Sequence, residues 1–191
     1  MNRPDANLQE FVRTWGFIPA RIFNNPSPGN LPTIFTSMFL HGSLLHLISN
    51  MLFLWVFGDN IEDELGHVNF LLFYCTAGAV GSLSQLAINP ASSIPMIGAS
   101  GAISGVLAAY LLLFPQARVL TAVILIFFIR LVYLPAWILL GFWVFIQLIE
   151  AFASLGMPHE AVNVAWFAHI GGFVSGLVLS VLILTKKASG R

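Results

Sequence analysis

Charged residues are scarce in this sequence, and cysteine occurs only once. Asp, Glu, Lys and Arg together make up 8% of the 191 residues, whereas ordinary soluble domains contain about 25%. Eight basic residues balance eight acidic ones, so the chain lacks the excess positive charge that binds nucleic acid, and we expect no nucleic-acid partner. Cys75 has no second cysteine with which to form an intramolecular disulfide. These scarcities exclude an ordinary soluble domain and a disulfide-linked fold.

The sequence is instead rich in long apolar runs. Hydrophobic residues make up 58% of the chain, and its mean hydropathy is +0.87. A membrane-spanning helix needs about 20 predominantly apolar residues, and an open β-sheet cannot span lipid. We therefore predict an all-α fold, a polytopic membrane helix bundle surrounded by the lipid bilayer. Its five predicted spans are residues 40–57, 68–88, 97–114, 134–153 and 162–184.

Two further segments are not predicted to cross the membrane. Residues 1–39 are rich in proline and contain the amphipathic stretch 8–22, which indicates an extramembrane N-terminal loop segment with a short interfacial helix. Residues 119–133 are apolar, but they are interrupted by Arg130 and too few to cross comfortably. We therefore predict that residues 119–133 form an interfacial or re-entrant segment.

The C-terminal residues set the predicted orientation. Basic residues are enriched on the cytoplasmic side of membrane proteins, so we expect residues 186–191 to form a basic cytoplasmic tail. Alternation through five spans then places residues 1–39 on the outer side. The membrane domain between these segments is expected to cover residues 40–185. The protein is thus predicted to be a multi-pass integral membrane protein, of the plasma (inner) membrane if it is bacterial.

Polar side chains inside spans are costly in lipid, which makes them candidate functional residues. Ser100 lies at the start of a helical run, where free backbone N–H groups and the positive end of the helix dipole favour an oxyanion. A serine hydroxyl becomes a good nucleophile when a base accepts its proton, and His169 is the only histidine in the later spans. If residues 97–114 and 134–153 are the only crossings between them, Ser100 and His169 lie on the same side of the membrane.

Other polar residues have weaker assignments. His46 and Asn50 are four residues apart, so they share one face of a helix and can both donate hydrogen bonds to a developing negative charge. His41 belongs to the mouth of such a site or to a distorted first turn. Glu150, near a helix end, is expected to be snorkelled or paired instead of catalytic. Taken singly, each polar residue also fits a structural hydrogen bond within the bundle, and only their combination favours catalysis.

Other protease chemistries fit the sequence less well. Several histidines could supply metal ligands, but the His-Glu-x-x-His motif of zinc proteases is absent, and we expect no metal. An aspartyl membrane protease needs two facing aspartates within its spans, whereas the aspartates here are Asp5, Asp59 and Asp63. The Gly-x-Ser-x-Gly elbow of soluble serine hydrolases is also missing around Ser100. We expect no cofactor.

An ordered set of motifs resembles the rhomboid family of intramembrane serine proteases. The resemblance runs from about residue 17 to residue 184. Its motifs are His41-Gly42-Ser43 followed by His46 and Asn50, then Glu62-x-x-x-Gly66, Gly98-Ala99-Ser100-Gly101 and Ala168-His169-Ile170-Gly171-Gly172.

The resemblance implies a role for each motif. Ser100 would be the catalytic nucleophile and His169 its general base, forming a dyad without a carboxylate. His46, Asn50 and the Ser100 backbone N–H would form the oxyanion hole. The substrates would be single-span membrane proteins, cleaved near the outer membrane face. Residues 134–153 match the span that in the family is thought to move aside for a substrate helix.

One feature departs from the family pattern. The common core of the family has six spans, whereas this sequence begins where the loop after the first span should be, so we expect that first span to be missing. A non-catalytic rhomboid-like membrane adaptor that binds client helices is therefore the alternative interpretation. Retention of both Ser100 and His169 argues against it. A small transporter is a third interpretation, but the sequence shows no internal repeat.

Overall fold

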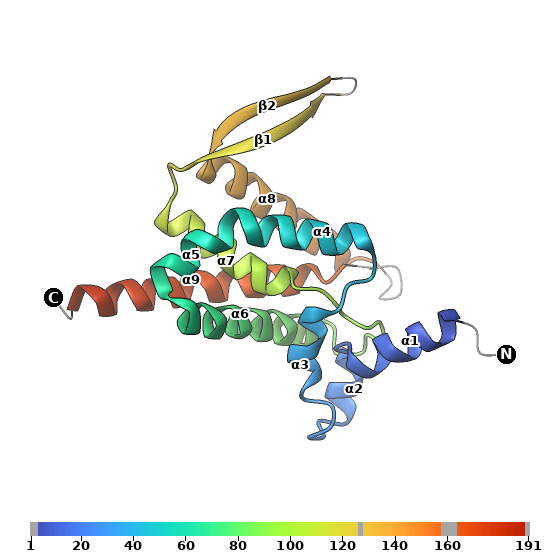
Figure 1. Ribbon diagram of the computed structural model, residues 1–191. Helices are drawn as coiled ribbons and strands as arrows, with labels where there is room; N and C mark the ends of the chain where they lie inside the picture. Colours follow the sequence, from blue (N-terminus) through green and yellow to red (C-terminus); the bar gives the residue numbers. More distant parts are fainter. Residues whose placement is uncertain (1–3, 126–127, 158–163, 190–191) are drawn as a thin grey trace.

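Helices make up most of the structure, a computed structural model that describes residues 4–125, 128–157 and 164–189 (Figure 1). In chain order they are α1 (Pro4–Trp15), α2 (Pro19–Asn24), α3 (Thr33–Thr36), the 3-10 turn η1 (Ser37–Phe39), α4 (Leu44–Phe53), the π-helical segment η2 (Leu54–Gly58), α5 (Asp59–Leu65), α6 (His67–Ile88), α7 (Ser100–Leu113), α8 (Ala136–Ser154) and α9 (Trp166–Ser189). Two strands, β1 (Arg118–Leu125) and β2 (Phe128–Pro135), lie between α7 and α8. The fold class is the polytopic helical bundle predicted from the apolar runs.

The helices agree with the predicted spans. Among the described residues, four helical segments are long and apolar enough to cross a membrane, namely Leu44–Leu65, His67–Ile88, Ala136–Ser154 and Trp166–Thr185. The predicted span 97–114 corresponds to α7, whose 14 residues extend about 21 Å, less than the roughly 30 Å of a hydrocarbon core. The predicted start of the last span at residue 162 lies outside the described residues. The protein is a multi-pass integral membrane protein.

The first span begins later and ends later than predicted. It starts at Leu44 instead of residue 40 because Ser43 caps the helix, its hydroxyl accepting a hydrogen bond from the backbone N–H of His46 at 3.1 Å. The helix then continues without a break through α4, η2 and α5. It stops at Gly66, whose φ of 76° is a left-handed conformation that favours glycine. The span therefore takes in Asp59–Leu65, which lies between the first two predicted spans, 40–57 and 68–88.

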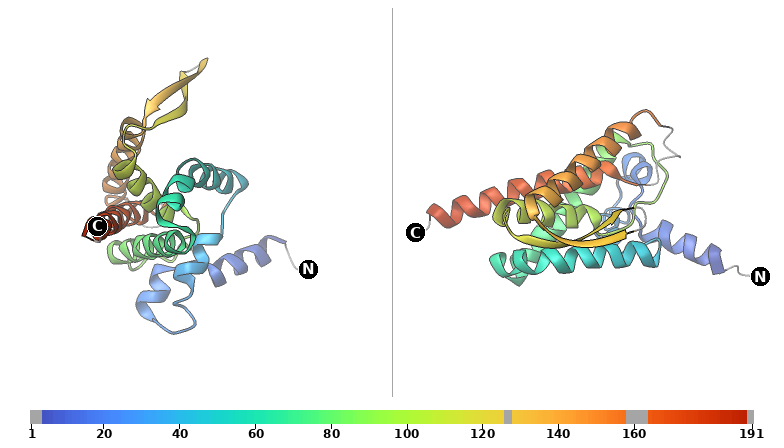
Figure 2. Two further views of the ribbon diagram at one scale, coloured as in Figure 1. Left: turned by 60° about the vertical axis from the view of Figure 1, so that its left-hand side comes forward. Right: turned by 90° about the horizontal axis from the view of Figure 1, so that it is seen from above.

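Helix α7 lies at the centre of the bundle. All residues from Gly101 to Tyr110 are buried, because this helix is apolar on every side. Figure 2 shows α7 surrounded by α6, α9, the α4–α5 helix and α8. The short central helix thus begins inside the bundle, with its N-terminal residue Ser100 below the ends of the longer helices.

Glycines allow α7 and α9 to touch backbone to backbone. A Cβ atom on Gly172 would collide with the carbonyl of Gly101, and one on Gly176 would collide with the carbonyl of Gly105. Small residues permit this close approach, which matters in lipid because hydrophobic burial contributes little to helix association there. The glycine motifs singled out in the sequence therefore form the contact between the helices that carry Ser100 and His169.

The N-terminal segment supports the loop that leads into α7. Phe17 is fully buried, and its backbone forms an antiparallel bridge with Met96. Farther along the same loop, the backbone N–H of Gly98 donates to the carbonyl of Ser37 at 2.9 Å. These contacts fix the path of the chain immediately before Ser100.

The amphipathic stretch 8–22 forms two helices instead of one. Helix α1 ends at Trp15 and α2 starts at Pro19, because the intervening residues pair with the loop before α7. One face of α1 carries exposed apolar side chains, Leu8, Phe11 and Trp15. Their contact with the membrane interface stays a prediction.

Residues 119–133 form a β-hairpin, which the sequence analysis did not predict. β1 pairs antiparallel with β2, with Val123 opposite Arg130. The segment is rich in β-branched and aromatic residues, which favour strands. Figure 1 shows the hairpin projecting from the end of the bundle where α7 stops and α8 starts. It adds no further helical crossing to the described structure, and its depth relative to the membrane stays a prediction.

We predict that Gly172→Ala will destabilise the bundle, because the added methyl group forces α7 and α9 apart. The expected loss is about 1–3 kcal/mol in the free energy of unfolding, typical of an overpacked contact. Gly141→Ala on α8 is the matched control, since a Cβ atom there meets no atom within 4 Å. Thermal unfolding in detergent measures both variants. Equal stability of the two variants would contradict the close packing of α7 on α9.

Candidate active site

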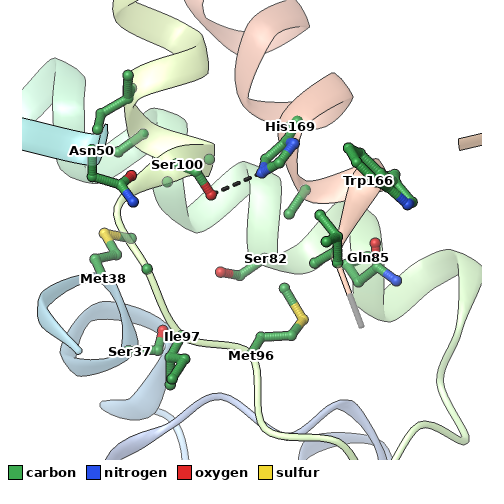
Figure 3. A pocket seen from close by; sticks show the side chains of 18 of the residues that line it. Ser37, Met38, Asn50, Ser82, Gln85, Met96, Ile97, Ser100, Trp166 and His169 are labelled. Atoms are coloured by element: carbon green, nitrogen blue, oxygen red, sulfur yellow. Dashed lines mark hydrogen bonds between the residues drawn. The ribbon is translucent and has the colours of Figure 1, made fainter. Parts of the chain in front are cut away.

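Ser100 and His169 meet inside the bundle. Ser100 is the first residue of α7, and His169 lies in the first turn of α9. The Ser100 Oγ is 2.8 Å from the His169 Nε2, a hydrogen-bond distance between residues 69 positions apart in the sequence (Figure 3). The backbone contact between α7 and α9 brings the two helix starts together. The structure therefore places this predicted pair on the same side of the bundle.

The other ring nitrogen of His169 also has a partner. Its Nδ1 lies 2.6 Å from the Oε1 of Gln147 on α8. A side-chain carbonyl oxygen only accepts hydrogen bonds, so Nδ1 carries the proton and donates a hydrogen bond to the Gln147 Oε1. Nε2 then has a free lone pair and accepts the hydrogen bond from the Ser100 hydroxyl. This tautomer is the one in which histidine can take a proton from serine.

Two tryptophans flank the same imidazole. The ring of Trp166 lies edge-on at 5.8 Å between centroids, and that of Trp143 is tilted at 6.2 Å. Trp143 and Gln147 are four residues apart on α8, so both face α9. Aromatic neighbours and a hydrogen bond at each nitrogen together restrict the rotation of the His169 ring.

His46 and Asn50 line the same cavity as Ser100, from α4. Asn50 is buried, and its Nδ2 donates to the backbone carbonyl of His46 at 2.8 Å, which leaves a second N–H on that nitrogen. Figure 3 shows the Asn50 amide beside the start of α7. As the first residue of that helix, Ser100 also keeps a backbone N–H that the helix does not use. The cavity that Ser100 lines is thus also lined by His46 and by Asn50, whose amide keeps an N–H to donate.

Gly98 makes room for His46. Its φ is +122°, and a Cβ atom there would lie 2.7 Å from the Cε1 and 2.8 Å from the Nε2 of the His46 ring. The glycine therefore allows an imidazole to rest against the chain just before Ser100.

A cavity of about 600 Å³ opens onto the serine and the histidine. One wall is polar and comes from α6, with Ser82, Gln85 and Asn89. Gln85 also joins α6 to α9, because its Oε1 accepts a hydrogen bond from the backbone N–H of Phe167 at 3.1 Å. The cavity can therefore hold both water and an extended peptide segment beside Ser100.

The sequence analysis missed Gln147, Gln85 and Ser82. All three are polar residues inside otherwise apolar helices, the same signal that singled out His46 and Asn50. Unlike the serine, histidines and asparagine that were singled out, these three residues do not belong to any of the motifs quoted from the sequence. They become candidate functional residues because they line the cavity, and the residue type alone does not indicate this.

Two other candidates lie outside the serine–histidine contact. The His41 ring stands edge-on to that of His46 at 5.1 Å between centroids, and burial, with a contribution from His46, lowers the pKa of His41. His41 is therefore neutral near pH 7. Glu150 is exposed on α8 and does not line the described cavity. Within the part of the chain that the structure describes, no three side chains of His, Cys, Asp or Glu gather as ligands for a metal ion.

We predict that Gly98→Ala will displace the His46 ring and lower the stability of the protein. The positive φ and the crowded ring together suggest a loss of about 1–3 kcal/mol in the free energy of unfolding. Gly29→Ala is the control, because a Cβ atom at this loop position meets only the Ser27 Oγ at 3.9 Å. Thermal unfolding in detergent compares the two variants. A loss of equal size in both would show that His46 does not depend on Gly98.

Comparisons with known proteins agree with this arrangement of helices. A family model described as "Rhomboid domain" matches residues 28–186. The chain is 32% identical over 150 residues to Rhomboid protein 1, mitochondrial, of Saccharomyces cerevisiae, covering 76% of this chain and 40% of that protein. It is 33% identical over 157 residues to RHOMBOID-like protein 1 of Arabidopsis thaliana, covering 82% and 36%.

The chain is similar to a bacterial protein to about the same degree. The chain is 30% identical over 155 residues to Rhomboid protease GluP of Bacillus subtilis, covering 81% of this chain and 26% of that protein. The chain thus spans less than half the length of these curated relatives. The extent of the family match and the identity to these relatives together show that the chain belongs to the rhomboid family.

Proposed function

We propose that this protein is an intramembrane serine endopeptidase that cleaves transmembrane proteins with a Ser100–His169 dyad. The observation that carries the proposal is the 2.8 Å approach of the Ser100 Oγ to the His169 Nε2 within an apolar bundle. The relative named Rhomboid protease GluP supports proteolysis as the activity. Ser100 and His169 are the catalytic residues in this proposal, and no metal or cofactor takes part.

The first step is acylation of the serine. The Ser100 Oγ attacks the carbonyl carbon of the scissile peptide bond while the His169 Nε2 accepts the hydroxyl proton. The carbonyl oxygen becomes an oxyanion, to which His46, the second N–H of Asn50 and the Ser100 backbone N–H donate hydrogen bonds. His169 then gives its proton to the leaving amine, and the C–N bond breaks.

The second step is hydrolysis of the acyl-enzyme. His169 removes a proton from a water molecule, and the resulting hydroxide attacks the ester carbonyl. The same donors stabilise the second oxyanion. The C–O bond to Ser100 breaks, the serine oxygen takes the proton back from His169, and the new carboxyl terminus leaves. Polar groups on the α6 wall of the cavity provide hydrogen-bonding partners for that water.

Single-span membrane proteins are the proposed substrates. Because α7 is shorter than the hydrocarbon core, a helix that ends near the inner surface places Ser100 several ångströms below the outer one. Helix α8 is the proposed entry side, since its buried residues form only a narrow seam, Ala136, Leu140, Gln147 and Ala151. A substrate segment would have to unwind beside α8 so that its carbonyl can reach Ser100.

We predict that Ser100→Ala will abolish cleavage of a transmembrane substrate reconstituted with the protein in liposomes. A fluorophosphonate, which reacts with activated serines, is expected to label the wild type and not this variant. Ser104→Ala is the matched control, because the Ser104 hydroxyl donates to the Ser100 carbonyl and Ser104 does not line the described cavity. Absence of labelling in folded wild-type protein would favour a non-catalytic membrane adaptor. Equal cleavage by wild type and Ser100→Ala would reject Ser100 as the nucleophile.

We predict that Asn50→Ala will lower kcat by roughly 10²–10³, equivalent to about 2.7–4 kcal/mol, with little change in KM. The reason is that the oxyanion exists only in the transition state and the intermediates, so its donors affect the rate more than substrate binding. Ile48→Ala on the exposed face of α4 is the control. Steady-state kinetics in liposomes measure both variants. A higher KM at unchanged kcat would place Asn50 in substrate binding instead.

A further inference from the structure

We propose that Gln147 is a positioning residue, whose side-chain carbonyl holds His169 in the tautomer and orientation needed to deprotonate Ser100. The proposal rests on the function proposed above. Both nitrogens of the His169 ring lie within hydrogen-bond distance of a side-chain oxygen. Gln147 Oε1 lies 2.6 Å from Nδ1, and Ser100 Oγ lies 2.8 Å from Nε2. The three side chains form a continuous chain of hydrogen bonds across α8, α9 and α7.

Gln147 takes the place that a carboxylate occupies in a serine–histidine–aspartate triad. In a triad, the carboxylate accepts the Nδ1 proton and fixes the histidine tautomer. No Asp or Glu lines the described cavity, so a neutral amide supplies the acceptor here. An amide oxygen fixes the tautomer without placing a negative charge in the bundle, where an ionised carboxylate would be strongly disfavoured.

Packing alone does not explain why a glutamine stands at position 147. The residue is 8% exposed and lies in the seam of α8 with Ala136, Leu140 and Ala151. A primary amide in such an apolar seam is unfavourable unless it is hydrogen-bonded, whereas methionine or leucine would fill the same space without that requirement. The bond to His169 satisfies the side-chain carbonyl of Gln147.

Because Gln147 lies on α8, the orientation of the His169 ring depends on the position of this helix. Gln147 and Trp143 both come from α8, while Ser100 and Trp166 come from α7 and α9. The contact between α7 and α9 holds the serine near the histidine even without α8. The Nδ1 partner, in contrast, is present only while α8 lies against α9. His169 is therefore fully oriented only when α8 is closed on the bundle.

The test compares Gln147→Met, which fills the space but accepts no strong hydrogen bond, with Gln147→Glu, which keeps an acceptor oxygen at the same reach. Ile149→Met, on the exposed face of α8, is the matched control. We expect Gln147→Met to lower kcat by about 10- to 100-fold at nearly unchanged KM, because a misoriented base slows only the chemical steps. As the neutral acid, the introduced glutamate side chain would still offer a carbonyl oxygen to Nδ1 without placing a charge in the bundle, so Gln147→Glu should retain most of the wild-type kcat. Thermal unfolding should be similar in all three variants.

NMR of isotope-labelled histidine provides a readout that needs no turnover. The His169 ring should carry its proton on Nδ1 in the wild type and lose this preference in Gln147→Met. A wild-type Nε2–H tautomer, an unchanged kcat in folded Gln147→Met, or equal losses in the Met and Glu variants would overturn the positioning role. If the tautomer shifts as expected but wild-type protein cleaves nothing, the hydrogen bond stands and the proposed protease activity fails.

Discussion

The direct contact between the backbones of α7 and α9 is the constraint on which the candidate site depends. Gly101 follows Ser100, and Gly172 lies three residues after His169, so the tightest contact between the helices is adjacent to the serine–histidine pair. In lipid, this contact is stabilised mainly by van der Waals packing, which side chains larger than hydrogen would weaken. The same glycines that hold the bundle together therefore set the distance between hydroxyl and imidazole.

A second support comes from outside the bundle. The N-terminal segment pairs with Met96 through Phe17 and bonds to Gly98 through Ser37, which fixes the loop before α7. His46 rests against Gly98 in that loop. Ser100 and the His46 ring are thus both supported by this loop, so a change in the loop would move both. The residues before the first span accordingly contribute to the geometry of the site.

The site is built almost entirely from neutral groups. Serine hydroxyls, the imidazoles of His46 and His169 and several side-chain amides line the described cavity, whereas no Asp, Glu, Lys or Arg does. Charges would be costly at this depth, whereas hydrogen bonds between neutral groups gain strength in a medium of low dielectric constant. In the proposed mechanism, orientation would then replace charge as the means of activating the serine, and both Trp143 and Gln147 contact the ring of His169.

The approximate positions of the spans follow from the sequence, as does the choice of Ser100, His169, His46 and Asn50, because polar residues stand out within apolar runs. Which polar residues face one another depends on how the helices pack, and local spacing does not specify this. Gln147 is 22 positions from His169 and on a different helix, so its partner could not be read from local spacing. The hairpin was not expected because residues 119–133 are mostly apolar, and a short apolar run does not by itself distinguish a strand from a helical segment.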